Sequence, residues 1–207
     1  MKNAFNRISF YLKSNIGIFI AVFLIFCAGL AFGGYTAATL PSEETATVKN
    51  YTDKFFSALI LNTTDKGSVF IKQFLYNLNL ISFIWISGFF VFLIPVSLLQ
   101  IFLKGFRTGF SIAFFAGTYK IKGTLYALCN YLSGNLILLP IIIFFTVFSM
   151  KNAAKNASGI KINRFRQKTF ITPKNIAMFA VCVLTIIITG LFDSYLMSSV
   201  LKMIVSV

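Results

Sequence analysis

The sequence has no histidine and few charged residues of either kind. Its 207 residues include 5 acids and 19 bases, so only 12% of the chain is charged, against about 25% in an average soluble domain. Without histidine, the common zinc sites and Ser-His-Asp triads lack an essential side chain. So few carboxylates also argue against hydrolysis by a carboxylate pair. We therefore expect a protein that is not an enzyme and holds no metal or other cofactor.

Apolar residues make up 57% of the chain, and they form uncharged runs long enough to cross about 30 Å of hydrocarbon. We predict an all-α polytopic membrane protein in which residues 1–207 form a single integral membrane domain. It has five transmembrane helices, one of them short. The predicted spans are 16–35, 75–103, 105–119, 125–148 and 175–196, with an outer segment over 36–72 and a basic cytoplasmic loop over 150–174.

The short span, 105–119, is predicted from charge rather than from length. As a helix it rises only about 22 Å, so a re-entrant segment is the alternative. If it crosses, with the N-terminus in the cytoplasm and the C-terminus outside, twelve bases lie inside and seven outside. If it does not cross, eight bases lie inside and eleven outside, which is contrary to the positive-inside rule. We therefore expect Lys104 and Arg107 at the cytoplasmic face and no charge within the spans, apart from Asp193 near the outer end of the last one.

Small residues line two of the predicted helices. Within the short span they recur every fourth position, at Gly105, Gly109, Ala113 and Gly117. Gly29 and Gly33 form a second pair in the first span. Such faces let helix backbones approach closely in lipid, so we predict packing within the chain, with a homodimer interface as the alternative.

The outer segment contains apolar residues at intervals of three and four, namely Val48, Tyr51, Phe55 and Leu59. This spacing predicts an amphipathic helix. Such a helix can lie on the outer membrane surface, or it can offer Tyr51, Phe55 and Leu59 as a docking ridge to the outer part of a partner protein. The two interpretations are compatible.

Polar side chains within the predicted spans include four asparagines, Asn77, Asn79, Asn130 and Asn135. In lipid, asparagines hydrogen-bond across helices at roughly 0.6 to 2 kcal/mol each, so helix packing is their expected role. Pro95 and Pro140 interrupt two predicted spans, and broken helices also build transport sites. A small transporter or channel is therefore the alternative function.

The predicted cytoplasmic loop is basic throughout and contains no acid. Its bases include Arg164, Arg166 and Lys168, for which we expect contact with anionic lipid headgroups at about 1 kcal/mol per base. Nucleic-acid binding is not expected, because few aromatic side chains alternate with these bases.

Several short runs of residues resemble the stage II sporulation protein M family. They are Phe74-Leu75-Tyr76, Trp85-Ile86-Ser87-Gly88, Pro95, Ile101-Phe102-Leu103-Lys104-Gly105-Phe106, Gly109-Phe110 and Leu132-Ser133-Gly134-Asn135-Leu136-Ile137-Leu138-Leu139-Pro140. At Ser133 this chain departs from the family, which commonly has proline there. Length, basic N-terminus and span layout also match, so the resemblance covers essentially the whole chain.

The resemblance implies a multi-pass protein of the bacterial cell membrane that acts in endospore formation. Members of this family scaffold two peptidoglycan hydrolases, stage II sporulation proteins D and P, while the mother cell engulfs the forespore. It therefore implies a mother-cell membrane protein, at the septum and then in the engulfing membrane, that takes part in peptidoglycan remodelling. Its expected partners are these hydrolases and membrane lipids.

Overall fold

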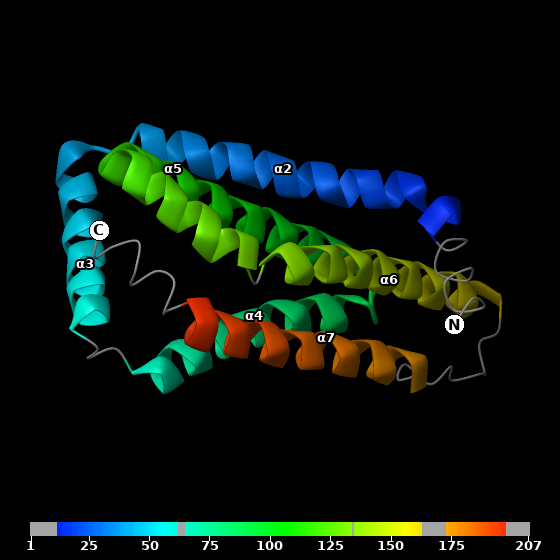
Figure 1. Cartoon of the computed structure of the whole chain (residues 1–207). Coiled ribbons are helices and arrows are strands. Elements are labelled where there is room, and N and C mark those ends of the chain that lie inside the picture. The colour runs from blue at the N-terminus through cyan, green and yellow to red at the C-terminus, as the bar shows by residue number, and fades with distance from the viewer. Residues whose placement is uncertain (1–11, 62–64, 134, 163–172, 198–207) are drawn as a thin grey trace.

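A computed structural model describes residues 12–61, 65–133, 135–162 and 173–197, which are 94% helical and contain no strand. The helices are α2 (Ile16–Ala38), α3 (Ser42–Ile60), α4 (Lys66–Ser87), α5 (Ile94–Ser133), α6 (Asn135–Ile162) and α7 (Pro173–Leu191). A 3-10 turn, η1 (Val91–Leu93), precedes α5, and a π-helical turn, η2 (Phe192–Met197), follows α7. The long helices form an elongated bundle, and α3 lies across one end of it (Figure 1).

Five helical segments in the described residues are long and apolar enough to cross a membrane. They belong to α2, α4, α5, α6 and α7. The prediction of an all-α protein with about five transmembrane helices is therefore confirmed.

The boundary between the second and third spans differs from the predicted one. The sequence predicts one span over 75–103 and a short one over 105–119. In the structure α4 ends at Ser87, and α5 begins at Ile94 and continues as a regular helix through Lys104. The predicted short span is therefore the second half of a full-length helix.

Two residues explain where α4 ends and α5 begins. Gly88 follows the last residue of α4, and Pro95 is the second residue of α5. Proline is favoured in the first turn of a helix, because its missing N–H would have no partner there in any case. Pro95 therefore begins a helix and does not interrupt a span, contrary to the prediction.

The helix α5 reverses direction at Lys120, whose φ of 51° and ψ of −128° are not helical. A positive φ at a residue with a side chain costs about 1–3 kcal/mol. The returning chain passes close to Phe115, because a Cβ at Gly123 would overlap the Phe115 carbonyl oxygen. Residues 94–119 thus form one crossing, and the chain beyond Lys120 runs back toward α6 (Figure 1).

Glycines bring the backbones of α2 and α5 into direct contact. A Cβ at Gly29 or Gly33 of α2 would overlap backbone atoms of α5, and a Cβ at Gly105 or Gly109 would overlap backbone atoms of α2. The contacts advance along both helices in the same direction, so α2 and the first part of α5 are parallel. Gly117 belongs to the predicted stripe of small residues but does not take part in this contact. A Cβ built on Gly117 would have no atom within 4 Å, so the close approach of α2 and α5 ends before this residue.

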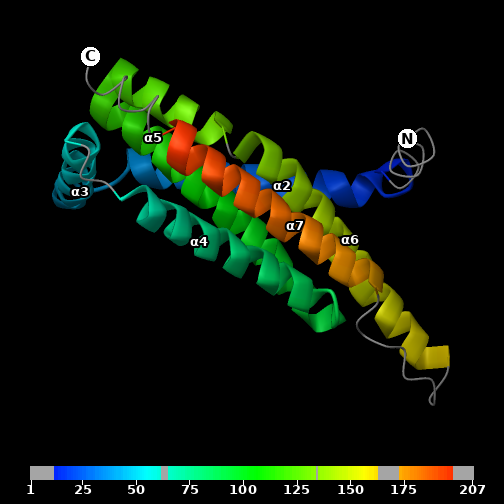
Figure 2. The ribbon, with the colours of Figure 1, turned by 60° about the horizontal axis from the view of Figure 1, so that its bottom comes forward.

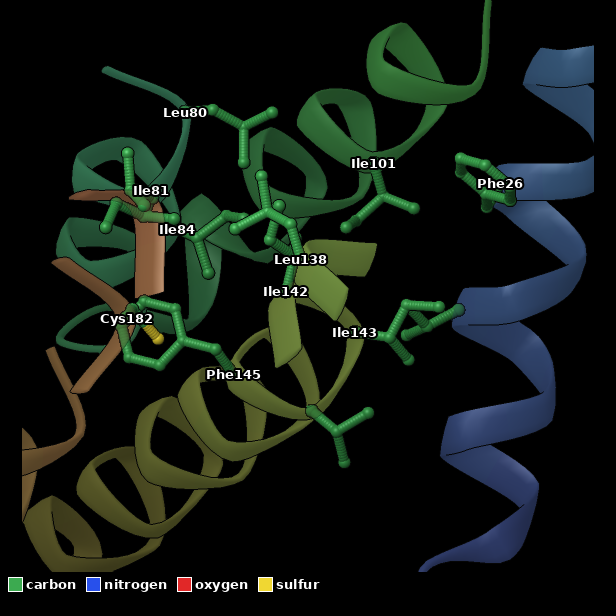
Figure 3. Close-up of a cluster of buried hydrophobic side chains, with 13 residues drawn as sticks. Phe26, Leu80, Ile81, Ile84, Ile101, Leu138, Ile142, Ile143, Phe145 and Cys182 are labelled. Carbon is green, nitrogen blue, oxygen red and sulfur yellow. The ribbon is translucent and has the colours of Figure 1, made fainter. Parts of the chain in front are cut away.

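A cluster of buried apolar residues holds the remaining helices against α5 and α2. It includes Phe26 of α2, Ile81 of α4, Ile101 of α5, Ile142 of α6 and Cys182 of α7 (Figure 3). Lipid tails are as apolar as these side chains, so the contact is stabilised by close van der Waals packing rather than by removal from water. The cluster positions α4 beside α5, where the polar residues described below meet.

The helix ends gather at two opposite faces of the bundle. At one face Lys151 of α6 donates a hydrogen bond to Asn15, and Asn156 of α6 donates to the carbonyl oxygen of Phe89 at 3.4 Å. We call it the N-terminal face, because α2 begins there. The opposite face carries α3 and the turn at Lys120, and we call it the α3 face (Figures 1 and 2).

Replacing Gly33 by alanine tests the backbone contact. We expect Gly33→Ala to lower the free energy of unfolding by about 1–3 kcal/mol or more, because the new Cβ would overlap the Phe106 carbonyl oxygen and neither backbone can easily move. Thermal unfolding in detergent micelles measures it. The matched control is Gly17→Ala on the same helix, where no atom lies within 4 Å. Equal stability of the two variants would contradict the contact.

Candidate functional site

Lys104 is a basic residue buried in the interior of the helix bundle. Its side chain is 8% exposed, and its Nζ donates a hydrogen bond to Oδ1 of Asn77 on α4 at 3.3 Å. The same Nζ lies 5.5 Å from the centre of the Tyr76 ring. Asn77 and Tyr76 are adjacent in α4, so one turn of that helix supplies both partners.

Arg107 lies one helical turn after Lys104 and meets the same ring. Its guanidinium carbon is 4.4 Å from the centre of the Tyr76 ring, which therefore interacts with two cations. Each such contact stabilises by about 0.5–2 kcal/mol, depending on how far water is excluded. Unlike Lys104, Arg107 is exposed on the surface of the bundle.

Asp193 brings a negative charge to this part of the bundle. It stands at the start of η2, and Nε2 of Gln73 on α4 donates a hydrogen bond to its Oδ2 at 2.5 Å. Its charge also acts on Lys104. We call Gln73, Tyr76, Lys104, Arg107 and Asp193, together with Asn77, the intramembrane polar cluster.

Two open pockets lie on either side of Arg107, between α4 and α5. One has a volume of about 460 Å³ and is lined by Tyr76, Lys104, Arg107, Thr108 and Ser111 among others. The other has a volume of about 420 Å³ and includes Tyr76, Arg107, Asn79 and Gln100 in its lining. Arg107 and Tyr76 therefore line both pockets, and polar side chains follow one face of α5 from Gln100 to Ser111.

The prediction that Lys104 and Arg107 lie at the cytoplasmic face is wrong. Arg107 is the fourteenth of the 26 residues from Ile94 to Tyr119, which places it about 18–20 Å along the helix from either end. The prediction failed because it took charged residues as the limits of spans, whereas α5 continues through both. The expectation of spans without internal charge fails for the same reason.

The helix α3 is attached to the rest of the bundle by a few specific contacts. The hydroxyl of Tyr119 donates a hydrogen bond to Oδ1 of Asp53 at 2.7 Å. The ring of Phe56 packs against Phe115, Tyr119 and Tyr126, with centroid distances of 6.1, 5.4 and 4.8 Å. Phe56 thus lies where α5 reverses direction, and it connects α3 to both arms of that turn.

Two residues of the predicted docking ridge remain exposed in this arrangement. Tyr51 is 72% exposed and Phe55 is 40% exposed, while the adjacent Phe56 faces the bundle. The side chain of Leu59 lies outside the part of the chain that the structure describes. A helix is therefore present in the predicted outer segment, and Phe56 and Asp53 are among its contacts with α5.

The other predicted site residues are distributed as follows. Asn77 belongs to the intramembrane polar cluster, Asn79 is exposed in the second pocket, and Asn135 is partly buried near the start of α6. The side chain of Asn130 lies outside the described residues, and so do Arg164, Arg166 and Lys168.

Sequence reasoning missed the intramembrane polar cluster as a site, although one signal could have revealed it. Glycine just after a helix and proline in the first turn of the next are frequent boundary residues. Gly88 and Pro95 would have divided the uncharged run near its middle. Lys104 and Arg107 would then have fallen inside the second of the two resulting helices.

Comparison with known proteins identifies one family. A family model described as Stage II sporulation protein M matches residues 22–197, which is most of the chain. No curated protein and no solved structure matches the chain.

Replacing Asn77 by leucine tests whether the cluster stabilises the bundle. We expect Asn77→Leu to lower the free energy of unfolding by about 1–3 kcal/mol, because the buried Lys104 loses the acceptor of its hydrogen bond. Thermal unfolding in detergent measures the effect. The matched control, Asn79→Leu, changes an exposed asparagine on the same helix and should alter stability by no more than about 0.5 kcal/mol. If both variants unfold alike, Lys104 does not depend on Asn77.

Proposed function

The chain belongs to the stage II sporulation protein M family, and we propose that it is a non-enzymatic membrane scaffold that anchors and recruits peptidoglycan hydrolases. Family membership identifies a sporulation-related protein, and its five apolar helices identify a multi-pass membrane protein. The proposed partners are stage II sporulation proteins D and P. The proposed place of action is the mother-cell membrane, at the septum and during engulfment of the forespore.

The placement of the acidic residues supports a role without catalysis. Asp53 accepts a hydrogen bond from Tyr119, and Asp193 accepts one from Gln73. Asp65 caps the start of α4, where hydrogen bonds from the Ser68 hydroxyl and the Gly67 N–H lower the pKa of its carboxyl group. Glu43 and Glu44 lie exposed in the first turn of α3, where acids stabilise a helix N-terminus. Each acid thus has a structural explanation.

The single observation that carries the proposal is the exposure of Tyr51 and Phe55 on α3. Phe56 and Asp53 of α3 contact α5, so the helix is attached to the bundle. Tyr51 and Phe55 of the same helix remain exposed and could contact a partner. Tyrosine and other aromatic residues are frequent anchors of protein interfaces. A hydrolase or its outer segment could bind there and be held beside the membrane.

The proposed orientation places the N-terminal face in the cytoplasm and the α3 face outside. Lys104 and Arg107 lie within the crossing formed by residues 94–119, so they are not counted on either side. In the sequence, the segment before α2 and the segment from residue 151 to 174 together hold ten bases and no acid, namely Lys2, Arg7, Lys13, Lys151, Lys155, Lys161, Arg164, Arg166, Lys168 and Lys174. Six bases, Lys49, Lys54, Lys66, Lys72, Lys120 and Lys122, and four of the five acids belong to segments at the α3 face. The positive-inside rule therefore favours this orientation, and we propose that the basic segment between α6 and α7 contacts anionic lipid.

A transporter or channel is a second candidate, which the intramembrane polar cluster favours. Ionisable side chains within spans commonly mark pathways for ions or substrates. Here Lys104 and Arg107 lie beside two pockets that also include Asn79. Solute flux through vesicles containing only this protein, reduced by Asn79→Leu or Asn135→Leu, would favour transport over scaffolding.

Cysteine labelling tests the orientation. In a variant whose Cys27, Cys129 and Cys182 are replaced by alanine, we expect Ala46→Cys on α3 to react with a membrane-impermeant maleimide in intact cells. Ser158→Cys in α6 should react only after the cells are permeabilised. Gel-shift labelling distinguishes the two positions. Labelling of residue 158 in intact cells would reverse the proposed orientation.

Removing the exposed aromatic surface of α3 tests the scaffold proposal. We expect Tyr51→Ala, Phe55→Ala and Leu59→Ala together to reduce recovery of the hydrolases with this protein about tenfold or more, because interface anchors dominate binding energy. Affinity purification from sporulating cells measures recovery, and membrane fractionation shows whether the variant still inserts.

The matched control is Lys49→Ala with Lys54→Ala, which changes exposed polar residues of the same helix and should leave recovery unchanged. Normal recovery with the triple variant would exclude α3 as the recruiting surface.

A further inference from the structure

The intramembrane polar cluster carries one positive charge more than its single acid can balance. Lys104 and Arg107 are both cations, and the cluster contains one acid, Asp193, whose charge acts on Lys104. Lys104 has Asn77 as well, and it is buried. Arg107 makes its described contact with the Tyr76 ring alone and has no carboxylate within ion-pair distance among the described residues.

The depth of Arg107 limits what can supply the missing negative charge. It lies about 18–20 Å from either end of its helix, and the hydrocarbon core is about 30 Å thick, so Arg107 is near the middle of the bilayer. Lipid phosphates lie beyond the surface of that core, and an arginine side chain does not reach them from its centre. A charged side chain at this depth is costly unless a partner of opposite charge accompanies it.

The surface around Arg107 could pack against one side of another membrane-spanning helix. It is exposed between two open pockets, and the neighbouring surface includes Leu75, which is 56% exposed, and the partly buried Phe106 and Phe110. A membrane-spanning helix could lay apolar side chains on these residues while an acidic side chain enters a pocket. Ser111 lines the same pocket and offers its hydroxyl to a carboxylate, whereas the Thr108 hydroxyl already donates to the Lys104 carbonyl oxygen at 2.9 Å.

We propose that the groove between α4 and α5 at Arg107 binds a transmembrane helix of a partner protein that carries an aspartate or glutamate near its middle. The carboxylate pairs with Arg107, and the ring of Tyr76 holds the guanidinium in place. The inference rests on the proposed scaffold function, because it assigns a membrane-embedded contact to a protein that recruits other membrane proteins.

A second copy of this chain is a poorer occupant of the groove. Four of its five acids lie in or next to α3 and α4 at the α3 face, and Asp193 already accepts a hydrogen bond from Gln73. A copy inserted in the same orientation therefore has no free carboxylate at the depth of Arg107. Charge thus favours a different protein as the partner.

A synthetic helix tests the proposal without knowledge of the natural partner. The full-length protein, labelled with a donor dye at Ala46→Cys in the cysteine-free variant, is placed in phosphatidylcholine vesicles. Acceptor-labelled leucine-alanine helices with a central aspartate, or with asparagine in its place, are added, and energy transfer measures association. We expect the aspartate helix to bind about tenfold more tightly, consistent with a polar contact of 1–2 kcal/mol in lipid.

Variants of Arg107 show whether this residue is responsible. Arg107→Gln should remove the preference for aspartate, and Arg107→Lys should retain part of it. Lys122→Gln, which removes a cation at the α3 face, is the matched control and should retain all of it. Because Arg107 is exposed, Arg107→Gln should fold, and its unfolding temperature in detergent verifies that it does.

Three results would overturn the proposal. The first is equal binding of both helices to the unmodified protein, and the second is a preference that survives Arg107→Gln. The third is an Arg107-dependent retention of phosphatidylglycerol, or Arg107-dependent pairing of two labelled copies, without any preference for the aspartate helix. Failure of the scaffold proposal is separate, because it appears as unchanged recovery of hydrolases after the α3 substitutions, whatever the synthetic helix does.

Discussion

The close contact between α2 and α5 is the constraint on which the rest of the structure depends. Glycines on both helices let the two backbones meet, and this contact fixes the position of α5 along its first 20 residues or so. The apolar cluster around Ile101 then places α4 and α6 against α5. Since α5 also carries Lys104, Arg107 and the turn at Lys120, its position determines where the intramembrane polar cluster lies and where α3 is attached.

The polar groups on α5 are arranged in two distinct ways. At mid-helix, the buried Lys104 donates a hydrogen bond to Asn77, which connects α5 to α4, and the charge of Asp193 acts on it from the end of α7. Arg107 is exposed one helical turn away, and its described contact is with the Tyr76 ring, which Lys104 also approaches. At the α3 face, the hydroxyl of Tyr119 and the nearby rings hold α3 in place. A membrane protein built in this way can offer two surfaces for assembly, one within the bilayer and one outside it.

The two proposed surfaces differ in their physical chemistry. Tyr51 and Phe55 lie outside the spans, where removal of apolar area from water drives association. Arg107 lies within the bilayer, where apolar contact alone gives little preference and a paired charge gives specificity. A partner that touches both surfaces would be held in position and in orientation. This is what a scaffold for enzymes acting beside the membrane requires.

Much of the fold follows from the sequence, because partition into lipid depends on local composition. The long apolar runs predict the helices, the small residues predict the close face that Gly29 and Gly105 make, and the spacing of Tyr51 and Phe55 predicts an amphipathic α3. The depth of Lys104 and Arg107 does not follow from such local rules. The energy of a charge in a membrane depends on its partners, and Asn77 and Asp193 come from distant parts of the chain. Only the tertiary structure brings them together, so it alone decides that these two bases lie near the middle of a span.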